Sequence, residues 1–165
     1  MTREASPHAG ASRKGKAVEH LIAASCILAS NGELNASTSL VDDEGVDIVF
    51  HRRGGSQTLA VQVKSRFRDA VSMSKGQFST DIRDVTFQPR SGLYLLFVAV
   101  DWHEPEFGPV WLVPSVEFAK RVKPNLRGLR RFAASAADTS HDQWSKYKLP
   151  KSQLAKRLME VLGEL

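Results

Sequence analysis

The chain has few of the residues on which several classes of protein depend. Cys26 is its single cysteine, which excludes an intramolecular disulfide framework and a cysteine-rich zinc site and suits a reducing compartment. The longest apolar run, residues 93–100, is far too short to cross a bilayer, and the amino terminus lacks the apolar segment of a secretion signal. We therefore expect a cytoplasmic protein with no membrane partner.

The histidines and the net charge do not by themselves identify a function. The histidines at positions 20, 51, 103 and 141 are scattered without metal-ligand spacing, and none belongs to a recognisable nucleophile motif. The net charge of +5 favours an anionic partner without identifying one.

The 165 residues suffice for one domain with a sizeable core. Residues 1–14 have no apolar periodicity, which predicts a flexible N-terminal arm followed by a single domain over residues 15–165. A helical stripe from Val18 to Ala29 and another from Leu154 to Leu165 predict helices at the two ends of that domain.

Between these helices the pattern alternates. Residues 93–100 are apolar on both faces and predict a central strand, residues 110–113 predict another strand, and Ser115 is the expected N-cap of a short helix. The stretch 69–90 is compatible with helix or extended structure. The order of elements predicts an α/β layer protein.

The most informative segment is a predicted hairpin, with strands at residues 45–50 and 58–65 around a turn at residues 52–56. Side chains alternate between the faces of a strand, so Gln62 and Lys64 interrupt one face of an otherwise apolar strand. With Asp47 on the first strand and Glu19 on the preceding helix, they predict a divalent-metal site that cuts phosphodiesters.

This combination of Glu19, Gly45-Val46-Asp47 and Gln62-Val63-Lys64 resembles the core of the PD-(D/E)XK nuclease superfamily, which includes restriction endonucleases and archaeal Holliday-junction resolvases. The match covers roughly the first half of the chain. The resemblance implies a restriction endonuclease-like three-layer α/β fold, with a central mixed sheet of about four or five strands flanked by helices. Gln62 stands where most members carry Asp or Glu. Mrr-like restriction enzymes are similar to this chain in having glutamine before the lysine.

The resemblance also implies a metal-dependent endonuclease that hydrolyses DNA in defence, repair or recombination. Asp47 would bind Mg²⁺ or Mn²⁺ directly, and Glu19 would bind the metal or its water. The side-chain oxygen of Gln62 and the backbone carbonyl of Val63 would complete the ligands, and Lys64 would orient or help to deprotonate the attacking water.

DNA is the expected partner, with RNA as an open alternative and a homodimer by analogy only. Arginines near the predicted site and in the basic segment that follows the short helix are the expected phosphate contacts, namely Arg52, Arg53, Arg66, Arg68, Arg127, Arg130 and Arg131.

Three other interpretations stay open. A lone polar residue on a strand is usually part of a solvated face, and about half of such basic runs serve only solubility. The same fold could also be a catalytically weak or inactive module that binds nucleic acid or protein, with Gln62 marking a weakened metal site, or a structural subunit of a larger complex.

Overall fold

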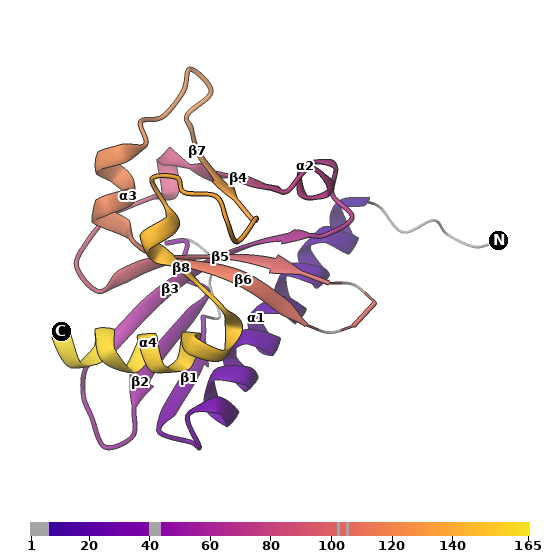
Figure 1. Cartoon of the computed structure of the whole chain (residues 1–165). Coiled ribbons are helices and arrows are strands. Elements are labelled where there is room, and N and C mark those ends of the chain that lie inside the picture. Colours follow the sequence, from indigo (N-terminus) through magenta and orange to yellow (C-terminus); the bar gives the residue numbers. More distant parts are fainter. Residues whose placement is uncertain (1–6, 40–43, 102, 105) are drawn as a thin grey trace.

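A computed structural model describes residues 7–39, 44–101, 103–104 and 106–165 of the chain. The structure has mixed α/β architecture, with a six-stranded main sheet flanked by helices (Figure 1). The strands of that sheet are β1 (Leu34–Thr38), β2 (Ile48–Arg52), β3 (Thr58–Phe67), β5 (Leu93–Val100), β6 (Phe107–Pro114) and β8 (Lys148–Leu149). The other elements are α1 (Pro7–Ala29), α2 (Val71–Ser74), β4 (Gln77–Arg83), η1 (Asp84–Thr86), α3 (Ser115–Arg121), β7 (Leu129–Ser135), η2 (Ser145–Tyr147) and α4 (Lys151–Glu164).

The main sheet is mixed, with strand order β1-β2-β3-β5-β6-β8. Strands β3 and β5 run parallel, with Val63 opposite Leu96, and the other neighbouring pairs are antiparallel. A parallel pair needs a crossover connection, and here the segment between β3 and β5 contains α2, β4 and η1. The central strand predicted at residues 93–100 is confirmed as β5, and seven of its eight residues are buried.

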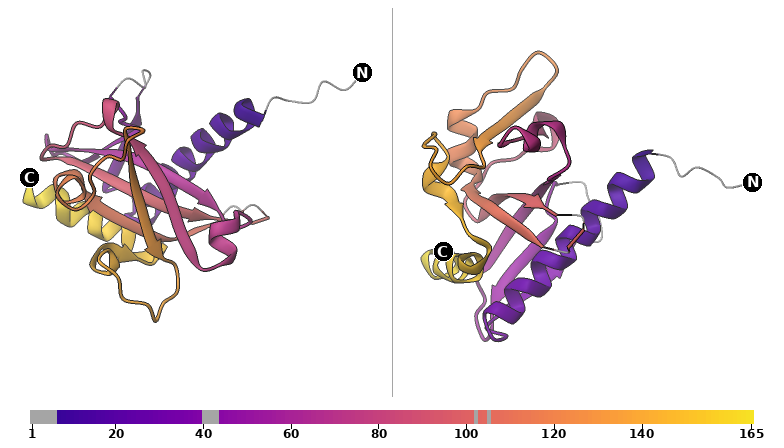
Figure 2. Two further views of the ribbon diagram at one scale, coloured as in Figure 1. Left: turned by 90° about the horizontal axis from the view of Figure 1, so that it is seen from above. Right: turned by 45° about the vertical axis from the view of Figure 1, so that its right-hand side comes forward.

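Helices α1 and α4 lie on one side of the main sheet, and α3, β4 and β7 lie on the other side (Figure 2). Each face of the sheet has its own apolar core. On one face, α1 and α4 pack through residues such as Ile22 and Leu158 against β2 and β3. This is the face of β3 that carries Val61. On the other face, an aromatic cluster joins α3 and a second sheet to β5 and β6, and this cluster takes none of its buried residues from β1, β2 or β3. The β3 portion of this second face therefore lies beside the aromatic core and not under it.

The second sheet is a two-stranded antiparallel ribbon made of β4 and β7. Its inner side carries Phe78, Ile82 and Phe132, all almost fully buried in the aromatic cluster. The side chains that alternate with them, such as Asp81 and Arg131, point away from that core. The ribbon and α3 thus form the layer opposite α1 and α4.

The structure corrects several details of the sequence prediction. The main sheet has six strands, not four or five, because the short polar β1 and the two-residue β8 extend its edges. Helix α1 begins at Pro7, so residues 7–14 are helical and not part of an irregular arm; residues 1–6 of that predicted arm lie outside the described residues.

The predicted N-cap role of Ser115 is wrong. Pro114 occupies the cap position, and the fully buried Ser115 hydroxyl donates to the carbonyl of Arg90 at 2.9 Å and accepts from its N–H at 3.0 Å. Ser115 instead fastens the segment before β5 to the start of α3.

Helix α1 is the longest helix, with 23 residues. It contains the charged residues Arg13, Lys14, Lys16 and Glu19, and in the described part of the chain no helix combines the length and apolarity that a membrane crossing requires.

Cys26 gives a direct test of how α1 packs. Its side chain is 2% exposed, and burial raises the pKa of the thiol to about 12. Because the thiolate is the reactive form, we expect a thiol reagent at pH 8 to label the native protein about a thousandfold more slowly than a free cysteine. Labelling can be followed by absorbance, and guanidinium-unfolded protein should react fully. Rapid labelling of the native protein would contradict the described packing of α1.

Candidate active site

Asp47 lies immediately before β2, where that strand begins its pairing with β3. Its backbone N–H donates to the carbonyl of Val61 at 2.9 Å, and its Oδ2 accepts a hydrogen bond from the N–H of Val63 at 2.6 Å. The side chain is only 8% exposed. The carboxylate therefore replaces a backbone acceptor at the point where the β2–β3 ladder ends.

The hydrogen bond from Val63 also fixes which way its carbonyl faces. In a strand, the N–H and C=O of one residue point to the same neighbouring strand. Since the N–H of Val63 points to Asp47, its carbonyl oxygen points toward the same gap beyond the start of β2. The structure thus directs one carboxylate and one backbone carbonyl toward the same region.

Gln62 is buried beside this pair and packs against Gly45. The register of Ile48 with Val61 places Gln62 next to Asp47 on the neighbouring strand. A Cβ atom on Gly45 would lie 2.7 Å from Nε2 of Gln62 and 3.6 Å from its Oε1. Gly45 has a φ of +68°, a left-handed conformation that glycine adopts without strain. The absence of a side chain at position 45 therefore leaves the space that the Gln62 amide occupies.

Lys64 projects from the same face of β3 as Gln62, because side chains two residues apart in a strand share a face. Its register partner is Phe97 on β5, at the boundary of the aromatic core, and the lysine is half-buried. It therefore lies beside the aromatic core, next to the part of the sheet that this core leaves uncovered.

Glu19 approaches from α1, and the structure gives it a partner there. Its Oε2 is 2.8 Å from Nζ of Lys16, and the residue is 7% exposed. The neighbouring Val18 packs in the same apolar cluster as Val61 and Val63, so this turn of α1 lies against β3. The contacts join Asp47, Gln62 and Val63 directly, whereas Glu19 is placed near them only through the helix that carries it.

These groups fit a hard divalent cation. Carboxylate, amide carbonyl and backbone carbonyl oxygens are the ligands such ions take, and Asp47 brings a buried negative charge to the site. Within the described ranges, no group of three or more His, Cys, Asp or Glu side chains is arranged to hold a metal.

Four of the predicted phosphate-contacting arginines already contact protein groups. The half-buried Arg130 contacts Asp84 and the carbonyl of Val122 through its guanidinium. The other three are exposed: Arg66 donates to the carbonyl of Ser79 at 2.8 Å, Arg68 to the carbonyl of Gly108 at 3.0 Å, and Arg131 to Asp81 at 3.0 Å. Their contacts with nucleic acid stay a prediction, as do those of Arg52, Arg53 and Arg127.

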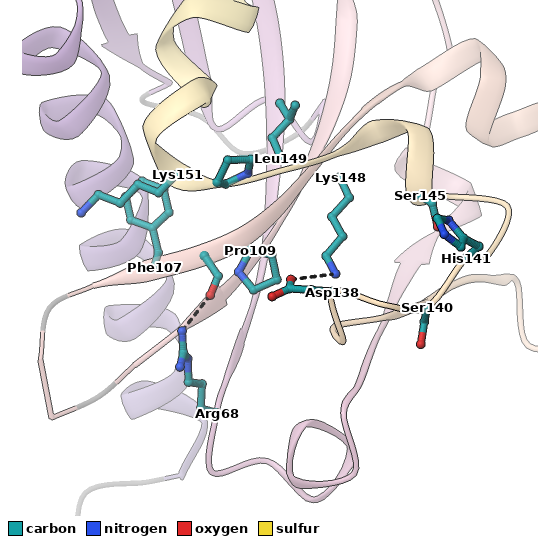
Figure 3. A pocket seen from close by; sticks show the side chains of 12 residues that line it. Arg68, Phe107, Pro109, Asp138, Ser140, His141, Ser145, Lys148, Leu149 and Lys151 are labelled. Carbon is teal, nitrogen blue, oxygen red and sulfur yellow. Dashed lines mark hydrogen bonds and ion pairs between the residues drawn. The ribbon is translucent and has the colours of Figure 1, made fainter.

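A cavity of about 620 Å³ lies away from the candidate site, between the start of β6 and the loop after β7 (Figure 3). Its lining includes Arg68, Lys148 and Lys151 but none of the four predicted catalytic residues. Lys148 donates to the carbonyls of Ala136 and Ala137 at 3.0 and 2.9 Å. These contacts assign Lys148 to holding the loop in place.

Two residues of the site were not given a role by sequence reasoning. Lys16 neutralises the buried Glu19 carboxylate, and the signal was their i, i+3 spacing on one helix. Gly45 packs against Gln62, and the signal was a glycine two residues before a strand aspartate, although its distance from residue 62 requires the pairing of β2 with β3.

Gly45→Ala should disturb the site more than the same change at Gly54. Both glycines have positive φ, +68° and +71°, so alanine pays a similar backbone cost of about 1–2 kcal/mol at each. A Cβ at Gly54 meets nothing within 4 Å, whereas at Gly45 it displaces the buried Gln62 amide. We therefore expect Gly45→Ala to unfold at lower denaturant concentration than Gly54→Ala, measured by circular dichroism. Equal midpoints would show that Gln62 is not held against Gly45.

Comparison with known proteins agrees with the architecture. No protein-family model matches the chain, and no curated protein matches it. A solved structure described as that of a bacterial homing endonuclease, I-Ssp6803I, is similar, with a TM-score of 0.53 and 15% sequence identity over 93% of each chain. At that identity the similarity shows that the two chains share a fold, over nearly their whole length.

Proposed function

We propose that this protein is a metal-dependent endonuclease that hydrolyses DNA phosphodiester bonds through the site at Asp47. The proposal assigns Asp47, Gln62, the carbonyl of Val63 and Glu19 to holding Mg²⁺ or Mn²⁺, and Lys64 to the attacking water. It places the chain in the PD-(D/E)XK superfamily, as a branch with glutamine before the lysine.

One observation carries the proposal. The hydrogen bond from the N–H of Val63 to Oδ2 of Asp47, 2.6 Å long, brings a buried carboxylate onto the segment that carries Gln62 and Lys64. The Asp47 carboxylate precedes β2, Lys64 lies on β3, and the Val63 carbonyl faces the gap beyond the start of β2. Such an arrangement suits a phosphate that is bound through a metal cation. The shared fold with a structure described as a homing endonuclease supports the same class of function.

The chain's own groups have separate tasks in this scheme. A bound divalent ion would hold the scissile phosphate and lower the pKa of its water. The Asp47 carboxylate, held by the N–H of Val63, and the Val63 carbonyl would hold that ion, and Glu19, paired with Lys16, would add a carboxylate from α1. Lys64, on the same face of β3 as Gln62, would orient the water with its ammonium and offset charge that develops on the phosphoryl oxygens.

The direct test titrates Mg²⁺ and Mn²⁺ into the full chain with supercoiled, linear, single-stranded and branched DNA as substrates, alongside Lys64→Ala and Lys75→Ala. Both lysines are solvent-accessible and lie on neighbouring parts of the chain, but Lys75 is outside the site. We expect metal-dependent cleavage by the wild type and Lys75→Ala and loss of cleavage in Lys64→Ala. Cleavage that survives Lys64→Ala in a clean preparation would refute the role assigned to this lysine.

A second candidate function rests on Gln62. A neutral amide in place of a carboxylate removes one negative charge and weakens the attraction for Mg²⁺. In this case the fold would serve as a binding module for nucleic acid, and it would bind DNA in a salt-sensitive manner that neither Asp47→Ala nor Lys64→Ala changes. Restoring the carboxylate with Gln62→Glu distinguishes the two, because it would create metal binding where the wild type has none.

A further inference from the structure

The β4–β7 ribbon has two sides of opposite character. Its inner side is held rigidly by the aromatic cluster, in which the ring of Phe132 stacks on that of Phe97 at a centroid distance of 3.6 Å. Its outer side is polar and partly charged. The residues that share this outer side are paired across the ribbon as Gln77 with Ser135, Ser79 with Ala133, Asp81 with Arg131 and Arg83 with Leu129.

The size of these side chains varies along the ribbon. One of the two inner pairs, Ser79 with Ala133, is small, while Gln77, Arg83 and Arg131 are long and exposed. A two-stranded ribbon fits the major groove of B-DNA, where arginine and glutamine side chains recognise the edges of guanine and adenine. The small Ser79–Ala133 pair would let the backbone approach closely, and the long side chains would reach the bases.

Asp81 sets the direction of Arg131. The carboxylate accepts from Nε and Nη2 of Arg131, at 3.0 Å each, and the arginine holds the pKa of Asp81 below its ordinary value. This pair leaves the other N–H groups of the guanidinium for a partner. The arginine is therefore both exposed and oriented before any ligand arrives, which lowers the entropy lost on binding.

The ribbon also lies beside the proposed catalytic lysine. Arg66 of β3 donates to the carbonyl of Ser79 on β4 at 2.8 Å. Arg66 shares a face of β3 with Lys64, which lies two residues or about 7 Å earlier along the strand. Beyond the far end of the ribbon, the loop before β7 projects from the body (Figure 1) and carries the exposed cations Lys123 and Arg127. Asn125 Oδ1 accepts from the N–H groups of Arg127 and Leu129 at 2.8 and 3.1 Å and keeps this loop ordered.

We propose that the outer face of the β4–β7 ribbon enters the major groove of duplex DNA beside the cleaved bond. Arg131 and Gln77 contact base edges there, and Arg127 contacts phosphates. Charge favours DNA as the partner, because the two exposed arginines of this face, Arg83 and Arg131, outnumber its one acidic residue, Asp81. This inference rests on the proposed function for its location relative to the cut, and it assigns sequence preference to residues outside the catalytic site.

The test selects preferred duplexes from a random DNA library with the full chain, in Ca²⁺ so that binding is measured apart from cleavage. Arg131→Ala should reduce affinity for the selected sequence by about tenfold or more and erase preference at one position, because a bidentate contact to a base carries discrimination of that order. Arg127→Ala should weaken binding to all sequences alike. The matched control is Arg157→Ala, since Arg157 is a half-buried arginine that is ion-paired with Glu160, and both lie on α4 in the layer opposite the ribbon.

Methylation protection of guanine N7 shows which groove is occupied, and we expect protection that Arg131→Ala removes. The unfolding midpoint of Arg131→Ala should match that of the wild type, because the exposed ion pair of Arg131 with Asp81 contributes little to stability. A protein that cleaves DNA but keeps its selected sequence in Arg131→Ala and Gln77→Ala would refute the ribbon proposal alone. Ribbon-dependent selection without cleavage in Mg²⁺ would refute the nuclease alone, and a protein that binds no duplex DNA would refute both.

Discussion

Asp47→Asn is expected to abolish metal-dependent cleavage while leaving the fold intact. Asparagine keeps a side-chain oxygen that can accept the hydrogen bond from the N–H of Val63, so the link between β2 and β3 survives. It removes the negative charge that anchors the cation. Metal-held charge stabilisation amounts to several kcal/mol, so we expect a loss of about a thousandfold in single-turnover rate. The rate should be measured at saturating Mg²⁺ on the preferred DNA substrate.

Asp47→Ala separates the chemical role from the structural one. Alanine removes the charge and also leaves the buried N–H of Val63 without its acceptor, which costs about 1–3 kcal/mol. Both variants should therefore be inactive, but only the alanine variant should unfold at clearly lower urea concentration. Calorimetric titration with Mn²⁺ should detect no binding to either. If Asp47→Asn retains more than about a tenth of the wild-type rate, the carboxylate is not the anchor that the proposal requires.

The hairpin that carries this site was open to prediction because its signals are local. Alternation along residues 58–65 identified which side chains share a face, and β2 and β3 are consecutive strands joined by a short turn. The structure extends β3 to Phe67 and begins β2 at Ile48, so Asp47 precedes the strand and is not within it. This shift explains why the carboxylate can cap the ladder at Val63.

The ribbon was not predictable in the same way. Asp81 and Arg131 are far apart in sequence, and the alternation in β4 is weak because Thr80 is the buried residue at its centre. The basic character of residues 120–131 suggested a solvated or phosphate-binding run, while the structure divides it: Arg130 turns inward to Asp84 and Arg131 turns outward to Asp81. Only the pairing of β7 with β4 determines which arginine faces out.

Helix α1 shows the opposite limitation. Gly10 and Gly15 lower helix propensity, and the apolar stripe starts only at Val18, so residues 7–14 gave no helical signal. The structure extends the helix beyond that stripe, and Nζ of Lys14 lies 5.6 Å from the centre of the Phe67 ring on β3. Apolar periodicity does not detect a turn that packs on the sheet through the stem of a charged side chain.

Phe132→Ala is the substitution with the largest expected effect on stability. The ring is fully buried and contacts the rings of Phe97, Phe78 and Trp144, at centroid distances of 3.6, 5.9 and 5.1 Å. These partners come from β5, β4 and the segment after β7, so the cavity left by alanine would separate the ribbon from the main sheet. We expect a loss of about 3–5 kcal/mol in the free energy of unfolding, measured by urea denaturation.

Leu126→Ala is the matched control, because that side chain is fully exposed on the loop before β7 and its loss should change stability by less than about 0.5 kcal/mol. Phe132→Leu should be intermediate, since leucine refills part of the cavity. A loss below about 1 kcal/mol in Phe132→Ala would contradict the packing of the ribbon on β5. Because the site at Asp47 draws its own support from β2, β3 and α1, the folded fraction of Phe132→Ala should still cleave DNA, but with a weakened sequence preference if the ribbon reads the bases.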